Sequence, residues 1–363
     1  MIPVTQPYLP ERATLDRYID GIYERRWLTN NGPLVQELTV RLEEYLGVQN
    51  LLLVANGTLA LQVAFELLQV KGEAVTTPFT FAATSSALRW QGITPRYADI
   101  DRADLNIDPG QIEQCINERT GAIVPVHVYG NPCRTEAIGR IAAKHGLPVV
   151  YDAAHAFGVR HEGVSVLSAG DVSTLSFHAT KLFHTVEGGA LVIRDPEQYE
   201  RARRVINFGL QSDGDVTVLG TNAKMSEMHA AVGLATLDSI DDIIRRRTAL
   251  VEYYRYHLSG YVEFQQRRGS ENGAYMPILF SSKEQADKVH ERLRQVGING
   301  RRYFAPALHD MVFFANGDFC PVAGDVAGRI LCLPLYAELA SEKVCWIADE
   351  VKRGLHSIGY TRQ

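Results

Sequence analysis

The chain has 363 residues, more than a typical single small domain, so two domains that share a large core are expected. Hydrophobic residues make up 46% and charged residues 22%, which is the usual balance of a globular protein in water. A formal net charge of −5 argues against general binding to nucleic acid or to an anionic membrane.

The sequence also lacks the signals of a membrane or secreted protein. No apolar run is long enough to span a bilayer, and residues 1–6 have neither the basic nor the apolar region of a secretory signal. The five cysteines are scattered and form no Cys-x-x-Cys pair, which predicts reduced thiols and no metal site. A cytoplasmic protein is therefore expected.

Helical and strand patterns alternate from about residue 35 to residue 193. Apolar spacing predicts helices over 37–46, 58–69, 80–90 and 134–145, and strands over 51–54, 73–77, 122–126, 147–151, 172–177 and 190–194. The continuous apolar run at 147–151 is typical of a strand buried on both faces of a parallel sheet. This alternation predicts an α/β sheet with helices on both faces.

The pattern changes near residue 239. A long charged helix over 241–257 is expected to act as a hinge, followed by strands at 275–280 and 330–335 and helices at 283–296 and 341–354. Ser282 and Gln285 have the spacing of a capping box. We therefore expect a large domain over 1–240, with an N-terminal arm, and a smaller α/β domain over 241–363.

Polar residues follow several strands of the large domain, and ligands of open α/β sheets bind at such carboxyl ends. Gly57 would let the backbone approach a ligand, and Thr58 begins a helix whose N–H groups favour an anion. Taken alone, these two residues favour the alternative, an ordinary strand-to-helix turn with a threonine cap. Phe81 could stack on a planar ring, or it could be a core aromatic.

Two further strand ends carry ionisable groups. Asp152 follows an apolar strand, so its carboxylate is partly buried and needs a partner, which a protonated pyridine nitrogen would provide. His155 could contact the ring of such a ligand. A capping aspartate and a structural histidine are the alternatives, and neither can be set aside on these residues alone.

Lys181 lies in an apolar stretch and Ser176 comes shortly before it, where its hydroxyl could donate to a phosphate oxygen. Burial lowers the pKa of an amine and makes it nucleophilic at neutral pH, although most single lysines are surface residues. A nucleophilic lysine and a buried carboxylate are what pyridoxal phosphate (PLP) requires, because the amine forms a Schiff base and the carboxylate keeps the pyridine nitrogen protonated. No glycine fingerprint of nicotinamide or ATP enzymes is present.

Nine short motifs stand in order along nearly the whole chain, at 27–33, 56–58, 78–84, 99–101, 125–130, 152–156, 176–181, 187–190 and 222–227. On these motifs the chain resembles the nucleotide-sugar aminotransferases of the DegT/DnrJ/EryC1/StrS family. The resemblance implies fold type I of the PLP enzymes, which is the aspartate-aminotransferase fold. In this fold a large, mostly parallel seven-stranded sheet domain is joined to a smaller C-terminal α/β domain.

The resemblance also implies roles for the site residues. Lys181 would bind PLP as a Schiff base and move the proton, and Asp152 would pair with the pyridine nitrogen. The remaining cofactor contacts would be ring stacking by Phe81, an edge contact from His155, and phosphate contacts from Gly57, Thr58 and Ser176. Asn222 would reach the phosphate of the neighbouring subunit's cofactor, which implies a homodimer with shared active sites.

The sequence departs from the family pattern next to this asparagine. Ala223 and Lys224 stand where the family commonly has an aromatic residue and an arginine. Lysine lacks the bidentate fork of arginine, so a phosphate or carboxylate contact here would differ. The loop that follows Lys181 is also bulkier and more apolar than is usual in the family.

The resemblance implies amino transfer from L-glutamate, giving 2-oxoglutarate, to a nucleotide-linked 4-keto-6-deoxyhexose. The expected product is dTDP-4-amino-4,6-dideoxy-D-glucose, for O-antigen or other deoxysugar biosynthesis. A C3-specific aminotransferase of the same fold and a non-catalytic PLP- or sugar-binding regulator remain as alternatives. Trp27, Tyr303 and His309 are candidate substrate contacts, and simple packing explains each of them equally well.

Overall fold

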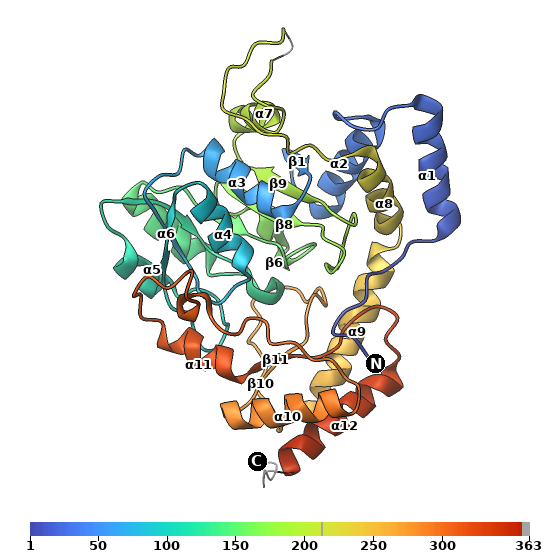
Figure 1. Cartoon of the computed structure of the whole chain (residues 1–363), viewed down its shortest axis with the longest axis vertical. Helices are drawn as coiled ribbons and strands as arrows, with labels where there is room; N and C mark the ends of the chain where they lie inside the picture. The colour runs from blue at the N-terminus through green and yellow to red at the C-terminus, as the bar shows by residue number, and fades with distance from the viewer. Residues whose placement is uncertain (212, 358–363) are drawn as a thin grey trace.

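The computed structural model describes residues 1–211 and 213–357, and a β-sheet flanked by helices lies at the centre of this part (Figure 1). Its strands are β1 (Leu51–Val54), β2 (Glu73–Thr76), β3 (Thr94–Tyr97), β4 (Thr120–Val124), β5 (Val150–Asp152), β8 (Val172–Ser176) and β9 (Gly189–Ile193). The strand orders β3-β2-β4 and β5-β8-β9-β1 are joined by parallel bridges that link Ile123 to Val149 and Val126 to Asp152. Only β9 runs antiparallel to its neighbours, so the predicted, mostly parallel sheet is confirmed.

Both faces of the sheet are covered by helices. Successive strand residues alternate between two cores, so that Leu51 and Leu53 pack on one face while Leu52 and Val54 pack on the other. The first face is covered by α2 (Pro33–Leu46) and α8 (Glu227–Leu237), and the opposite face by α3 (Gly57–Leu67), α4 (Ala82–Trp90) and α7 (Pro196–Val205). A third cluster lies between β2, β4 and β5 and the helices α5 (Pro109–Cys115) and α6 (Thr135–His145).

The C-terminal part begins with α9 (Ile240–Leu258), which runs away from the sheet (Figure 1). The antiparallel pair β10 (Pro277–Leu279) and β11 (Ile330–Cys332) packs with α9, α10 (Lys283–Gln295) and α12 (Ser341–His356) around a separate core. Ile2 belongs to this core and pairs with Ile298, so the first residues of the chain contact its C-terminal part. The division near residue 240 stays a prediction.

The remaining elements are short or peripheral. They are α1 (Arg12–Arg25), α11 (Pro321–Arg329), the hairpin of β6 (Arg160–His161) and β7 (Val164–Ser165), and the 3-10 turns Val128–Gly130, Val166–Ser168 and Leu308–Asp310. Within the described residues, no helix combines the length and the apolar character needed to cross a membrane.

Several elements differ from the sequence prediction for identifiable reasons. The strand expected at 147–151 is found at Val150–Asp152, because Pro148 has no N–H to offer to a neighbouring strand. One of the two hydrogen bonds of the predicted capping box forms: Ser282 Oγ accepts from the N–H of Gln285 at 3.2 Å. The second does not, because Gln285 Oε1 accepts from the N–H of Ser281 and not from that of Ser282. Helix α8 was not predicted, because it is buried nearly all round and shows no apolar stripe.

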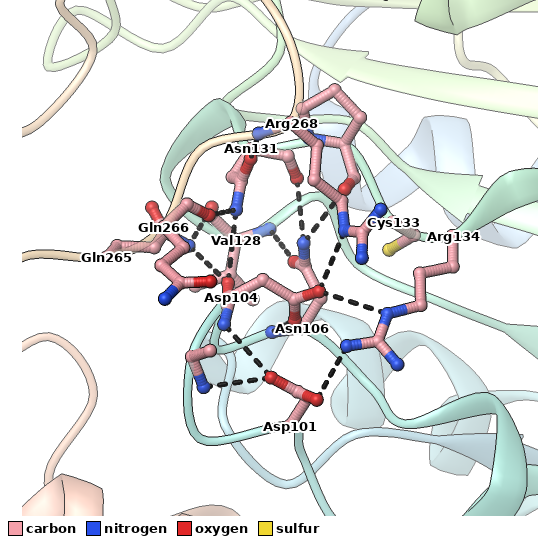
Figure 2. Close-up of polar contacts among 12 residues, drawn as sticks. Asp101, Asp104, Asn106, Val128, Asn131, Cys133, Arg134, Gln265, Gln266 and Arg268 are labelled. Atoms are coloured by element: carbon pink, nitrogen blue, oxygen red, sulfur yellow. Dashed lines mark hydrogen bonds and ion pairs between the residues drawn. The ribbon is translucent and has the colours of Figure 1, made fainter.

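A polar network ties the C-terminal part to the turn that follows β3 (Figure 2). Asp104, which is 3% exposed, pairs with Arg134 at 3.3 Å and with Arg268 at 2.9 Å. Burial acts to raise the pKa of Asp101, but the N–H groups of Asp104 and Ala103 and the Arg134 guanidinium outweigh it and lower that pKa. Asp101, in the motif at 99–101, therefore fixes the turn whose Asp104 contacts Arg268 of the C-terminal part.

Candidate active site

A cavity of about 700 Å³ lies at the carboxyl ends of the central strands. It brings together residues that follow β1, β2, β5 and β8, and it is closed by side chains from the C-terminal part. Its lining includes Asn56, Gly57, Thr58, Thr80, Phe81, Asp152, His155, Ser176, His178, Lys181, Glu187, Tyr275, Arg301, Tyr303 and Phe304. Eight predicted site residues therefore face one space: Gly57, Thr58, Phe81, Asp152, His155, Ser176, Lys181 and Tyr303.

Asp152 ends β5, and its carboxylate is held at the wall of the cavity. One oxygen accepts from Thr84 Oγ1 at 2.7 Å and the other from the N–H of Ala154 at 3.1 Å. Burial raises the pKa of Asp152, while these two hydrogen bonds and the charge of Lys181 act to lower it. A buried carboxylate held in this way suits a cationic or N–H partner inside the cavity.

Lys181 follows β8, and its amine lies within electrostatic reach of Asp152. The turn is fixed because the N–H of Lys181 donates to the carbonyl of His178 at 2.8 Å. Burial lowers the pKa of Lys181, and the charges of Asp152 and Tyr303 act against that decrease. The amine is therefore closer to its neutral, nucleophilic form than an exposed lysine would be.

His155 is a neutral hydrogen-bond donor at this site. Its Nδ1 accepts from the N–H of Tyr129 at 3.2 Å, so in the neutral ring the hydrogen is on Nε2. Burial lowers the pKa of His155 well below its usual value, and the charge of Lys181 lowers it further. The ring is parallel to that of Phe304, with centroids 5.9 Å apart, so aromatic packing fixes its orientation.

The start of α3 lies beside Ser176 at the wall of the cavity. Asn56 caps the helix, because its Oδ1 accepts from the N–H of Leu59 at 2.8 Å. A Cβ at Gly57 would lie 2.8 Å from Ser176 Cβ and 3.1 Å from Ser176 Cα, so a larger residue would not fit between the two strand ends. The helix N-terminus, Thr58 and Ser176 thus surround a small space suited to a phosphate.

Three predicted residues do not line this cavity. Trp27 is 46% exposed and donates to the carbonyl of Thr29, while His309 lies in the turn Leu308–Asp310 with Asp310 3.5 Å away. Asn222 is exposed and pairs with Asn207 at the base of an extension between α7 and α8 that leaves the body of the molecule (Figure 1). Contacts of these residues with substrate or with a second subunit stay predictions.

The structure adds site residues that sequence reasoning missed. Thr84 was seen only as part of a motif, and Tyr275 and Arg301 had no local signal because they come from loops of the C-terminal part. Lys224, singled out as a departure from the family pattern, donates to Asn207 Oδ1 at 2.8 Å and lies over the ring of Phe208. Within the described residues, no group of three or more His, Cys, Asp or Glu side chains is arranged to hold a metal ion.

A buried carboxylate explains why two distant motifs occur together. Glu227, fully buried, accepts from the N–H of Leu34 at 3.0 Å and of Val35 at 2.9 Å, and so caps α2 from the start of α8. A Cβ at Gly32 would lie 2.6 Å from the Glu227 carboxyl carbon, so this glycine is needed for the close approach. The N–H of Glu227 also donates to the carbonyl of Leu28 at 3.0 Å, so the motifs at 27–33 and 222–227 meet at Glu227.

Comparisons with known proteins agree with this geometry. Residues 11–352 match a model described as the DegT/DnrJ/EryC1/StrS aminotransferase family. The chain is 43% identical over 358 residues to a dTDP-4-amino-4,6-dideoxy-D-glucose transaminase of Shigella dysenteriae, covering 96% of this chain and 98% of the relative. A relative of the same name from Escherichia coli is 41% identical over 355 residues, covering 94% and 96%. A crystal structure of DesI in the presence of its TDP-sugar product matches with a TM-score of 0.93 at 35% identity, covering 98% of this chain and 94% of that chain.

Proposed function

We propose that this chain, which belongs to the DegT/DnrJ/EryC1/StrS aminotransferase family, converts dTDP-4-keto-6-deoxy-D-glucose to dTDP-4-amino-4,6-dideoxy-D-glucose with L-glutamate and PLP. The predicted family and fold type I are confirmed by the comparisons, and the chain is an aminotransferase. The observation that carries the proposal is that Asp152, at the end of β5, and Lys181, in the turn after β8, line one cavity.

The residues of the cavity fit PLP. Gly57, Thr58 and Ser176 would hold its phosphate at the start of α3, and the Asp152 carboxylate would accept from the pyridine N–H. Phe81 is 54% exposed and would cover one face of the ring, and His155 would donate from Nε2. When bound, PLP supplies an aldehyde and a ring that accepts the electrons released by removal of a proton.

The chain's own groups would do the proton transfer and the positioning. Lys181 would hold the cofactor through a covalent bond and, once released by the amino donor, would take a proton from the donor and later return one to the sugar carbon. Asp152 is fixed by Thr84 and Ala154, so its charge would stay aimed at the pyridine nitrogen. Holding amine, ring and substrate in one geometry would supply much of the rate.

We also propose that the active form is a homodimer in the cytoplasm. Asn222 lies outside the cavity of its own chain, on an extension whose side chains include exposed Phe208, Val216 and Leu219. Such an extension suits contact with a second copy, where Asn222 would reach the phosphate. All five cysteines are free, which supports a reducing compartment.

The test is a substrate panel. Purified protein is incubated with L-glutamate and dTDP-, UDP- or GDP-linked keto sugars, and the position of the new amine is determined by NMR. We expect an amine at C4 of the dTDP sugar, and Lys181→Ala should abolish turnover while exposed Lys71→Ala should not. An amine at C3, or turnover that survives in Lys181→Ala, would refute the proposal.

A further inference from the structure

We infer that Tyr275 holds the amine of Lys181 in position whenever that amine is not bound to the cofactor, an inference that rests on the proposed function. During amino transfer the lysine must leave the cofactor and still stay within reach of the proton that it moves. A flexible four-carbon side chain needs a fixed partner to stay in one place.

The contact itself is direct. Lys181 Nζ donates to the hydroxyl of Tyr275 at 3.5 Å. Within the described part of the chain, the amine makes no other hydrogen bond. Burial raises the pKa of Tyr275, so its hydroxyl stays neutral. A neutral acceptor can orient the amine without adding a second negative charge to that of Asp152. A second negative charge would favour the ammonium form of Lys181 and so weaken it as a base.

Tyr275 is also held rigidly by its neighbours. Its ring meets His155 edge-on, with centroids 4.7 Å apart, and lies 5.6 Å from the rings of Tyr129 and Tyr303. Among titratable groups, the charges of Asp152 and Tyr303 act to raise the pKa of Lys181, and the charge of Lys181 in turn lowers the pKa of His155. Aromatic packing therefore fixes the direction of the Tyr275 hydroxyl, although the residue lies on a loop.

The backbone before Tyr275 is fastened to both parts of the molecule. Arg247, a buried residue of α9, donates to the carbonyls of Gly273 at 2.7 Å and Ala274 at 3.0 Å. Asn272 donates to the carbonyls of His155 and Phe157, each at 3.0 Å. The segment 272–275 thus places Tyr275 relative to the sheet that carries Lys181.

The same segment is pressed closely against α9. Gly273 has φ +66°, and a Cβ there would lie 2.7 Å from Arg247 Cβ and 3.0 Å from its carbonyl carbon. No larger residue fits this position without moving the segment. This contact, together with those of Arg247 and Asn272, fixes the place of the Tyr275 hydroxyl, as expected for a positioning residue.

The test removes the hydroxyl and keeps the ring. Tyr275→Phe is compared with Tyr254→Phe, in which another buried tyrosine loses a hydroxyl that donates to the carbonyl of Pro334, away from the cavity. The first measurement is the rate at which an acylating reagent labels Lys181 in the full-length, cofactor-free chain as a function of pH, read by mass spectrometry. The second is kcat and KM of the loaded enzyme.

In Tyr275→Phe the ammonium form loses an acceptor, so the midpoint of the labelling curve should fall by about half a unit to one unit. Because the amine is no longer oriented, kcat should fall about tenfold while KM for the keto sugar stays within about twofold. Tyr254→Phe should change neither quantity. If Tyr275→Phe keeps the wild-type midpoint or the wild-type kcat, the inference is wrong. If the wild type shows no transamination, the proposed function is wrong. The difference in labelling midpoint between wild type and Tyr275→Phe then still tests the contact between Lys181 and Tyr275.

Discussion

The cap that Glu227 places on α2 gives a stability prediction that can be worked out from the contacts. Glu227→Gln keeps the size of the side chain but replaces one carboxylate oxygen with an NH₂ group. One of the N–H groups of Leu34 and Val35 then loses its acceptor and faces a second donor inside a fully buried site. The negative charge that favours the positive end of the α2 dipole is lost as well.

A hydrogen bond to a charged group contributes roughly 1.5–3 kcal/mol, and a charge at a helix terminus up to about 2 kcal/mol where it is partly buried. We therefore expect Glu227→Gln to lower the free energy of unfolding by about 2–4 kcal/mol. The assay is urea unfolding at fixed protein and cofactor concentration, because binding and association also shift stability. Glu44→Gln, at an exposed position of the same helix, should change the free energy of unfolding by less than about 0.5 kcal/mol. A Glu227→Gln midpoint equal to that of Glu44→Gln would refute the capping argument.

Two further predictions concern the cofactor turn and the response to acid. Gly57→Ala should weaken PLP binding at least about tenfold, measured by fluorescence titration, because the new methyl group would lie 2.8 Å from Ser176 Cβ; unchanged affinity would mean that the turn has room to spare. Burial lowers the pKa of His127 to about 3, against roughly 6.5 in the unfolded chain. Below pH 6.5 the unfolded state therefore binds a proton that the native state does not, so stability falls as the pH drops toward 3. Between pH 6 and pH 4 the wild type should lose about 2–3 kcal/mol more than His127→Asn, and equal losses in urea titrations would show that His127 does not contribute.

The sequence predicted the centre of the site because that centre is built locally. Asp152, Lys181 and Gly57 each follow a strand that an apolar run makes visible, and the carboxyl ends of parallel strands converge at one edge of a sheet. The residue types at those ends then indicated the chemistry. The convergence of the three residues in one cavity agrees with that reasoning.

The rest depended on contacts between distant parts of the chain. Tyr275 reaches Lys181 from a loop 94 residues further along, and the Glu227 carboxylate meets α2 across 193 residues. The periodicity of the sequence cannot predict either contact, because each is made by a single residue, at a loop or at a helix start, whose neighbours in sequence do not share its role. Family motifs marked the regions that meet, but the physical reason for Gly32 or Gly273 became visible only in the packed structure.

The wide spacing of the cavity residues also constrains how the protein is made. The lining runs from Asn56 to Phe304, and Ile2 shares backbone hydrogen bonds with residues 297 and 299. During synthesis, apolar segments near the N-terminus therefore stay exposed to solvent until the later residues that pack against them have left the ribosome. A vitamin B6 cofactor would therefore bind only after most of the chain has been synthesised. Truncated chains would expose apolar surface and would not show the absorption of the bound cofactor.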